Sequence, residues 1–269
     1  IRYAAEALTC GPDEPVLVFN GDVLSGVDLR HLVAEHETTG AAVTLYLTRV
    51  ADPRAFGLVP TDAEGRVTEF REKPTTVQEI VTDQINAGCY VFRRDVIDRI
   101  PVGQVVSVER DTFPGLLAQG HRLTGVVDDG YWLDLGTPLS FVRGSADLVL
   151  GRVDSSAVPG PTGERLVLGD ARVADDATVT GGSVVADSCV VHAGAVVEGS
   201  VLMPGVVVAA GAAVRDSVLA TGARVGEKAS VSGTVVAEGA VIGAGVELVE
   251  GARVWPGAVI PDGGLRFSS

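Results

Sequence analysis

Residues 183–250 read SVVADSCVVHAGAVVEG, SVLMPGVVVAAGAAVRD, SVLATGARVGEKASVSG and TVVAEGAVIGAGVELVE, four segments of seventeen residues in the same phase. Within each segment apolar residues recur every six positions, as Val185, Val191 and Val197 do in the first. The same spacing extends over about ninety-five residues, from Leu166 to Ile260. A repeat of six, six and five residues predicts coils with three short faces and one shortened corner. Gly and Ala follow the apolar positions, where the chain must turn tightly.

This hexad pattern resembles the left-handed parallel β-helix of hexapeptide-repeat proteins. A single coil has too little core to be stable alone, so we expect the coils to stabilise one another. The apolar positions therefore predict a structural core and no site. Some hexapeptide β-helices are acyltransferases that use a histidine between coils, and His192 is the one histidine of this region. The motifs upstream favour a solvated position for His192 instead.

The first half of the chain has a different pattern, in which strand-like and helix-like segments alternate. Val16–Phe19 is typical of a buried parallel strand, and Asp28 is a plausible N-cap for a helix over 29–37. Further strands are expected at 41–50, 58–59, 67–70 and 87–92, and further helices at 95–100, 108–119 and 138–150. This alternation predicts an α/β domain over 1–150, a linker over 151–165 and the β-helix over 166–269.

Composition limits the possible functions. The 269 residues carry a net charge of -14, which argues against nucleic acid as a partner because such partners need a basic patch. The three cysteines, Cys10, Cys89 and Cys189, match no metal-ligand spacing and indicate a reducing compartment. No apolar run is long enough to span a membrane, and no secretory pattern opens the chain. We therefore expect a cytoplasmic protein that has no membrane partner.

Six short motifs stand in order along the first half of the chain. They are FNGD at 19–22, FGLV at 56–59, FREKP at 70–74, INAGCYVF at 85–92, SVE at 107–109 and YWLDLGTP at 131–138. In this order, and ahead of a β-helix, they resemble the nucleotide-sugar pyrophosphorylases, which are sugar-1-phosphate nucleotidyltransferases. The closest likeness is to the mannose-1-phosphate guanylyltransferases. The resemblance covers essentially the whole chain and implies a Rossmann-like nucleotidyltransferase domain.

The resemblance implies transfer of a nucleotidyl group from a nucleoside triphosphate to a hexose 1-phosphate. The first choice of substrates is GTP and mannose 1-phosphate, which give GDP-mannose and pyrophosphate. Glucose 1-phosphate with dTTP, UTP or ATP is the second choice. A non-catalytic regulatory paralogue that binds nucleotide-sugar is the alternative from another class. Acyl transfer at His192 remains a further alternative.

By resemblance, Asp22 and Asp134 hold one Mg2+. Asp22 follows a predicted strand, and Asp134 precedes a Gly-Thr-Pro turn. Mg2+ is usually held by one or two carboxylates and substrate phosphates, so this pair suits the ion. The competing interpretations are a turn residue for Asp22 and a helix N-cap for Asp134.

The resemblance also implies the substrate contacts. Lys73 is assigned to the sugar phosphate, because its ammonium is a compact point charge. Sugar contacts are assigned to Glu72, Asn86, Gly88 and, with helix capping as its alternative, Glu109. Asn20 and Gly21 are added from the FNGD motif, and Trp132 is either a wall of the sugar pocket or a core residue.

The family opens with a strand and a glycine-rich loop that holds the nucleotide, and residues 1–15 do not match that pattern. We therefore expect an N-terminal segment of about 30 residues or more to be missing, on the size of a βαβ unit. The fragment alone is then expected to be inactive. We also expect a homo-oligomer through the β-helix, because the open end of a solenoid must be covered.

Overall fold

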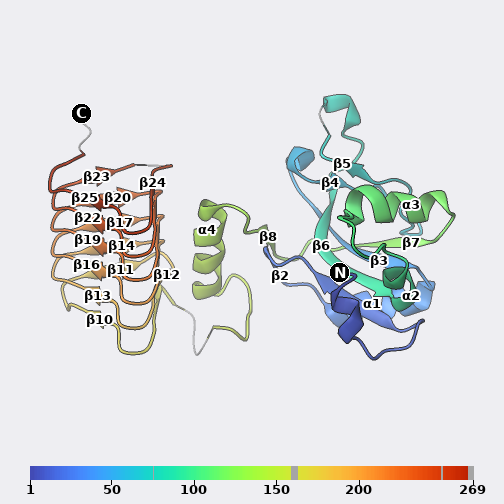
Figure 1. Cartoon of the computed structure of the whole chain (residues 1–269), viewed down its shortest axis with the longest axis horizontal. Helices are drawn as coiled ribbons and strands as arrows, with labels where there is room; N and C mark the ends of the chain where they lie inside the picture. The colour runs from blue at the N-terminus through green and yellow to red at the C-terminus, as the bar shows by residue number, and fades with distance from the viewer. Residues whose placement is uncertain (75, 159–162, 250, 266–269) are drawn as a thin grey trace. The chain divides into compact units, whose positions relative to one another are not determined.

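The computed structural model describes residues 1–74, 76–158, 163–249 and 251–265. The chain forms two compact units, Ile1–Trp132 and Leu133–Ser269 (Figure 1). Strand β8 (Trp132–Asp134) runs across the boundary between the two units. Over the described ranges, no helix is both long enough and apolar enough to cross a lipid bilayer.

A mixed six-stranded sheet forms the centre of the first unit, and the ten-residue strand β6 (Gln84–Arg93) lies in its middle. Strand β3 runs antiparallel to β6 and parallel to β7. Strands β1 and β4 pair with β6 antiparallel, and β5 extends the sheet beyond β4. The other strands of this unit are β1 (Pro15–Phe19), β2 (Val23–Ser25), β3 (Val43–Arg49), β4 (Gly57–Leu58), β5 (Arg71–Glu72) and β7 (Leu123–Val127).

Helices and turns of the first unit pack on both faces of this sheet. Tyr90 and Phe92 of β6 share one apolar cluster with α2 and α3, whereas Cys89 and Val91 share another with α1. The Asp28 carboxylate accepts hydrogen bonds from the N–H groups of Arg30 and His31, which confirms the predicted N-cap. The elements are η1 (Ala4–Ala7), α1 (Leu29–Thr39), η2 (Pro53–Ala55), η3 (Val77–Glu79), α2 (Arg94–Asp98), η4 (Val108–Thr112) and α3 (Phe113–Ala118).

The prediction of a buried parallel strand at 16–19 is wrong. Strand β1 runs antiparallel to β6, and β6 is its one strand partner within the described residues. Leu17 and Phe19 are exposed, while Val16 and Val18 pack against the core. A short apolar run does not distinguish a strand buried on both faces from an edge strand with one covered face.

The single helix predicted over 108–119 is divided in the structure. A π-helical turn, η4, is followed by α3, and Pro114 stands in the first turn of α3. Proline has no N–H to donate, so it starts a helix more readily than it continues one. The wide turn of η4 carries Glu109.

The second unit is a parallel β-solenoid with the three-faced coils of a left-handed hexapeptide-repeat β-helix, as the hexads predict (Figure 1). The first sheet contains β9 (Arg165–Val167), β12 (Ser183–Val185), β15 (Val201–Leu202), β18 (Val218–Leu219), β21 (Val235–Val236) and β24 (Arg253–Val254). The second contains β10 (Arg172–Val173), β13 (Val190–Val191), β16 (Val207–Val208), β19 (Arg224–Val225), β22 (Val241–Ile242) and β25 (Val259–Ile260). The third contains β11 (Thr178–Thr180), β14 (Val196–Glu198), β17 (Ala213–Arg215), β20 (Ser230–Ser232) and β23 (Glu247–Leu248).

The predicted seventeen-residue repeat is the register of the central coils. Val184, Val201, Val218 and Val235 lie above one another in successive strands. The outer coils each hold one residue more, since Leu166 pairs with Val184 and Val235 pairs with Arg253. The apolar hexad residues fill the interior, where valine, leucine and alanine side chains from all three sheets form one buried cluster.

A ladder of hydroxyl groups lines the shortened corner of the coils. Ser183, Ser200, Ser217 and Thr234 are all buried there. The Oγ of each serine accepts a hydrogen bond of 3.1 Å from the backbone N–H of the next ladder residue. Each hydroxyl also donates to a backbone carbonyl of its own coil. The ladder thus satisfies polar groups that the tight corner would otherwise bury without partners.

Helix α4 (Pro138–Val149) belongs to the second unit. Thr137 is its N-cap, and the Thr137 side chain accepts a hydrogen bond from the Ser140 N–H. The helix packs on the coils near Gly182, which approaches the backbone of Ala146. The sequence boundary at residue 150 follows the change in periodicity, whereas the packing groups α4 with the coils. Residues 159–162 of the expected linker lie outside the described residues.

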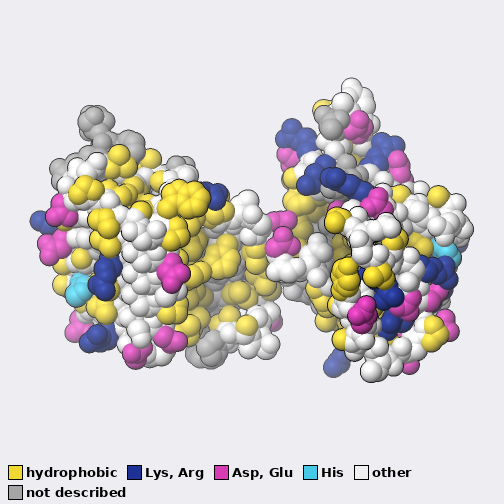
Figure 2. Space-filling model, in the orientation of Figure 1, with side chains coloured by type: hydrophobic (Ala, Val, Ile, Leu, Met, Phe, Trp, Pro, Cys, Tyr) yellow, Lys and Arg dark blue, Asp and Glu magenta, His cyan; other side chains and the backbone are white. Residues whose placement is uncertain are grey.

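Acidic and basic side chains are interspersed on the molecular surface. On the face drawn in Figure 2, Lys and Arg side chains lie beside Asp and Glu side chains in both units. Ion pairs such as Arg54–Asp52 and Glu198–Arg215 are examples of this arrangement. Exposed pairs of this kind contribute little to stability.

Candidate functional site

Asn86 and Gly88 lie in an irregular part of β6. Between Leu45 and Leu47 of β3 the pairing shifts from Tyr90 to Asn86, so β6 carries extra residues over this stretch. Gly88 has a φ of 76°, which a glycine adopts without strain. Bulges of this kind redirect side chains near functional sites.

Gly88 also meets the end of β1. The Asn20 N–H donates to the Gly88 carbonyl over 2.8 Å. A Cβ added to Gly88 would lie 2.9 Å from Asn20 Nδ2, so the two residues approach too closely for any other side chain. The structure therefore brings together two motifs that are far apart in the sequence. Around Gly21 the space is open, since a Cβ there would meet no atom within 4 Å.

The Asn86 amide is the centre of a buried polar network. Its Nδ2 donates to the Tyr90 hydroxyl over 2.7 Å and to Oε1 of Glu109. Its Oδ1 accepts from the Gly88 N–H over 3.2 Å. Burial raises the pKa of the Tyr90 hydroxyl, which therefore keeps its proton. The network links β6 to η4 and places Glu109 beside Asn86.

Trp132 lies beside the same stretch of β6. Its Nε1–H donates to the Ala87 carbonyl over 3.0 Å, and its ring meets Phe56 edge-on with centroids 5.4 Å apart. Phe56 in turn accepts a backbone hydrogen bond of 3.2 Å from the Lys73 N–H. The indole is thus fixed by one polar and one aromatic contact, and it borders the Asn86–Gly88 stretch.

Lys73 follows β5 and is exposed, with a left-handed backbone φ of 45°. Glu72 is the last residue of β5 and pairs with Gly57, and its side chain lies outside the described part of the structure. The FREKP and FGLV motifs therefore lie side by side in the sheet. Their two-strand pairing positions the backbone of Lys73.

The two predicted metal ligands belong to different compact units. Asp22 is exposed just after β1, and no described residue forms a hydrogen bond or ion pair with its carboxylate. Asp134 is half-buried, and its Oδ1 accepts from the Gly136 N–H over 2.7 Å. Within the described ranges no cluster of three or more His, Cys, Asp or Glu could hold a metal ion. Two carboxylates suit a hard divalent ion whose coordination is completed by phosphates and water.

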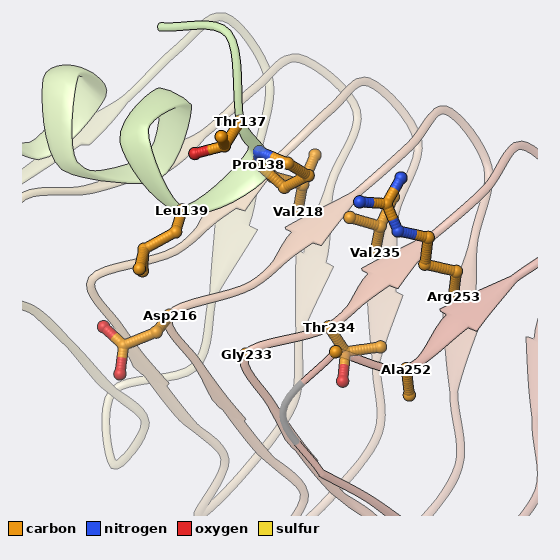
Figure 3. A pocket seen from close by; sticks show the side chains of 11 residues that line it. Thr137, Pro138, Leu139, Asp216, Val218, Gly233, Thr234, Val235, Ala252 and Arg253 are labelled. Atoms are coloured by element: carbon orange, nitrogen blue, oxygen red, sulfur yellow. The ribbon is translucent and has the colours of Figure 1, made fainter. Parts of the chain in front are cut away.

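Two further features lie in the second unit. His192 is exposed on a coil turn, in keeping with the solvated interpretation. A cavity of about 360 Å³ lies between the start of α4 and the coils, and Figure 3 shows Asp216 and Arg253 at its edges. None of the sequence-predicted site residues is among the described residues that line this cavity.

The first unit thus gathers Asn20, Asn86, Gly88, Glu109 and Trp132 around one stretch of β6. The residues that sequence reasoning missed are Tyr90 and Phe56. Tyr90 belongs to the INAGCYVF motif and Phe56 to the FGLV motif, and this membership was the one sequence signal that could have identified them. Their roles depend on contacts with distant parts of the chain.

Comparison with known proteins gives the family. Residues 1–149 match the family described as Nucleotidyl transferase, and residues 162–264 match the GMPPB C-terminal domain. A mannose-1-phosphate guanylyltransferase of Mycobacterium tuberculosis strain H37Rv is 54% identical over 258 residues, which are 96% of this chain and 71% of the relative.

More distant relatives match shorter parts. The mannose-1-phosphate guanylyltransferase catalytic subunit beta of Drosophila melanogaster is 36% identical over 52% of this chain and 37% of its own length. A probable mannose-1-phosphate guanylyltransferase 2 of Arabidopsis thaliana is 30% identical over 72% of this chain and 53% of its own length. Because the family match covers more than half of the chain and the mycobacterial relative matches nearly all of it, the chain belongs to the nucleotidyl transferase family.

Proposed function

We propose that this protein transfers a guanylyl group from GTP to mannose 1-phosphate and releases pyrophosphate. The observation that carries the proposal is the 54% identity, over nearly the whole chain, to a mannose-1-phosphate guanylyltransferase. The polar network of Asn86, Gly88 and Glu109 supports it, because the network holds acceptor groups in place and a sugar needs precisely placed polar groups.

In the proposed reaction, a phosphate oxygen of mannose 1-phosphate attacks the α-phosphorus of GTP in line, and pyrophosphate leaves. No covalent enzyme intermediate is needed, so the protein's work is positioning and charge neutralisation. Lys73 would bind the sugar phosphate through its ammonium. Glu72, Asn86, Gly88 and Glu109 would contact the sugar, with Asn20 and Gly21 beside them and Trp132 as a wall.

Enzymes of this family generally use a divalent metal ion. We propose Mg2+, with Asp22 and Asp134 as the residues that would hold it. The ion would neutralise phosphate charge. The exposed Asp22 carboxylate and the half-buried Asp134 carboxylate, each with at least one oxygen that no described residue engages, suit this role.

We further propose a homo-oligomer assembled through the β-helix and a cytoplasmic location. Trp255 and Val259 on the last coil are 80% and 69% exposed, and exposed apolar side chains often mark interfaces. The three cysteines are free, which suits a reducing compartment. Light scattering of the chain and of a Trp255→Lys variant tests the assembly. The mass of the assembly in solution should be smaller for the variant.

The substrate is tested by titration calorimetry of the chain with mannose 1-phosphate and its C2 epimer glucose 1-phosphate, in Mg2+ buffer. We expect mannose 1-phosphate to bind more tightly. Nucleotidyl transfer is measured as pyrophosphate release by the protein that its gene encodes. The rate of release with GTP should exceed the rates with ATP, UTP and dTTP. Preference for glucose 1-phosphate would overturn the sugar assignment. Binding of GDP-mannose without any transfer would favour a regulatory paralogue.

A further inference from the structure

Tyr90 is a tyrosine whose ring and hydroxyl have different surroundings. The side chain is 1% exposed, and its ring packs against Phe92 and Phe113 with centroids 6.0 and 5.4 Å apart. A phenylalanine would fill the same space in this aromatic cluster. The hydroxyl is therefore the feature that calls for a separate explanation, since a buried polar group needs a partner.

The Tyr90 hydroxyl contacts residues of the candidate site. It accepts the Asn86 Nδ2–H over 2.7 Å, and it also interacts with the side chain of Asn20. It thus touches two residues of the predicted site, Asn20, which directly follows β1, and Asn86 of β6.

The hydrogen bonds of Asn86 leave it little freedom. Both Nδ2 hydrogens have acceptors, namely the Tyr90 hydroxyl and Glu109 Oε1, and Oδ1 accepts from the Gly88 N–H. An amide nitrogen has two hydrogens to donate, so Asn86 has none left for a sugar. Only the second lone pair of Oδ1 remains for a ligand. The Nδ2 group of Asn86 therefore holds the Glu109 carboxylate by a hydrogen bond, and its Oδ1 faces the Gly88 backbone.

We propose that Tyr90 is a positioning residue, which fixes the Asn86 amide through its hydroxyl and thereby orients the Glu109 carboxylate toward the hexose of the bound sugar 1-phosphate. The proposal rests on the proposed function for the identity of the ligand. Two hydrogen bonds connect the three side chains in the order Tyr90, Asn86, Glu109. Removal of the first link frees the amide to rotate, and the carboxylate loses a fixed donor.

The variant for the test is Tyr90→Phe, which keeps the ring and removes the hydroxyl. The matched control is Tyr46→Phe, because Tyr46 is also 1% exposed and its hydroxyl donates over 3.2 Å to Asp128, away from the network. Both variants keep the buried ring and lose the hydrogen bonds of the hydroxyl, those to Asn86 and Asn20 in Tyr90→Phe and that to Asp128 in Tyr46→Phe. Circular dichroism and thermal unfolding show whether each variant is folded.

The first measurement needs no ligand. In the folded chain, NMR should show two separate and slowly exchanging side-chain amide signals for Asn86. In Tyr90→Phe these signals should move and exchange faster, while in Tyr46→Phe they should stay as they are. Unchanged Asn86 signals in Tyr90→Phe would overturn the proposal, whatever the protein binds.

The second measurement is the dissociation constant for mannose 1-phosphate. Loss of one buried hydrogen bond should weaken binding by about three- to ten-fold in Tyr90→Phe, and Tyr46→Phe should bind as the unmodified chain does. The double variant Tyr90→Phe/Glu109→Gln should bind about as weakly as Glu109→Gln alone, because Tyr90 acts through Glu109. Additive effects of the two substitutions would overturn the proposal. If the unmodified chain binds neither mannose 1-phosphate nor glucose 1-phosphate, the proposed function fails, and the Asn86 signals still decide the positioning.

Discussion

Two lysines hold backbone conformations that L amino acids rarely adopt. Lys73 has a φ of 45° and Lys228 a φ of 55°. Each such residue costs of order 1–3 kcal/mol, which the surrounding structure must offset. Lys228 lies on a coil corner, so a left-handed lysine is not by itself a sign of function. A role for Lys73 is supported instead by its position after β5, in the FREKP motif beside Phe56.

The first prediction separates strain from binding at Lys73. Lys73→Gly removes both the strained backbone and the ammonium, so the free energy of unfolding should stay equal or rise by about 1 kcal/mol. Binding of mannose 1-phosphate should weaken about ten-fold or more, because a charge-assisted contact is lost. Lys228→Gly is the control and should change stability alone. Urea unfolding and calorimetry give the two quantities, and unaltered binding in Lys73→Gly would refute the phosphate assignment.

The second prediction concerns Gly88. Gly88→Ala places a Cβ 2.9 Å from Asn20 Nδ2 at a φ of 76°, so the free energy of unfolding should fall by about 1–3 kcal/mol. Gly21→Ala is the matched glycine, because its Cβ would meet no atom within 4 Å. Urea midpoints compare the two variants. Equal midpoints would show that the approach of β1 to β6 is looser than in the structure.

The sequence identified Asn86, Gly88 and Glu109 as neighbours in function but not the way in which they meet. Their motif membership was visible, whereas the bulge in β6 and the π-helical turn that carries Glu109 were not. Tyr90 stood in the same motif as Asn86 and was assigned no role, because its hydroxyl gains a function only from the fold of Asn86 against it. Roles that rest on the nearest neighbours in space cannot be deduced from spacing along the chain.

Helix α1 is joined to the sheet by a buried histidine. His36 is 5% exposed, and its Nδ1 shares a hydrogen bond of 3.0 Å with the Thr44 hydroxyl of β3. Burial lowers the pKa of His36 below its usual value of 6.5, and the positive charge of Arg93 adds to this effect. The folded state therefore holds a neutral imidazole between α1 and β3.

The third prediction follows from that pKa. Below about pH 6.5 the unfolded chain binds a proton at His36 that the folded chain resists, so stability is full above this pH and falls as the pH decreases toward the folded pKa. The slope should not exceed about 1.4 kcal/mol per pH unit for one proton. His36→Gln lacks the titrating group. Urea unfolding between pH 8 and pH 5 should give the flatter curve for the variant, and parallel curves would contradict the assignment to His36.

Two elements show where local pattern was insufficient. The apolar run of β1 fits either a central or an edge strand, and only the pairing with β6 decides between them. The apolar spacing over 108–119 fits one helix, but Pro114 marks the place where η4 gives way to α3. Periodicity reports which side chains are apolar, and it is silent about backbone hydrogen bonds.

The solenoid was the most predictable part of the molecule. Its core needs one apolar residue per face, so the hexads gave the coil, the sheets and the seventeen-residue register directly. The Ser-Val and Thr-Val pairs marked the phase of the repeat in the sequence. Their hydroxyl ladder became evident only with the coils stacked, because each bond joins residues one coil apart.

The fourth prediction tests the ladder. Ser217→Ala removes the acceptor of the Thr234 N–H and leaves that group buried without a partner, which should reduce the free energy of unfolding by about 1–3 kcal/mol. Ser217→Thr should restore most of it, because Thr234 occupies the same corner. Ser230→Ala, whose hydroxyl has no side-chain hydrogen bond in the described structure, is the control. Equal thermal midpoints for Ser217→Ala and Ser230→Ala would argue against the ladder as a source of stability.

The ladder also bears on how such a domain changes length during evolution. Loss of residues 200–216 would bring the Ser217 N–H over Ser183 Oγ and Val218 over Val184, so the newly adjacent strands would pair in the same register as the native ones. Loss of a single hexad would turn the following strands onto the wrong faces and leave the hydroxyls out of line. We therefore expect this half of the protein to tolerate duplication or deletion by unequal recombination only when a whole coil is gained or lost. The gene segment that encodes one coil is then the unit in which the domain changes length.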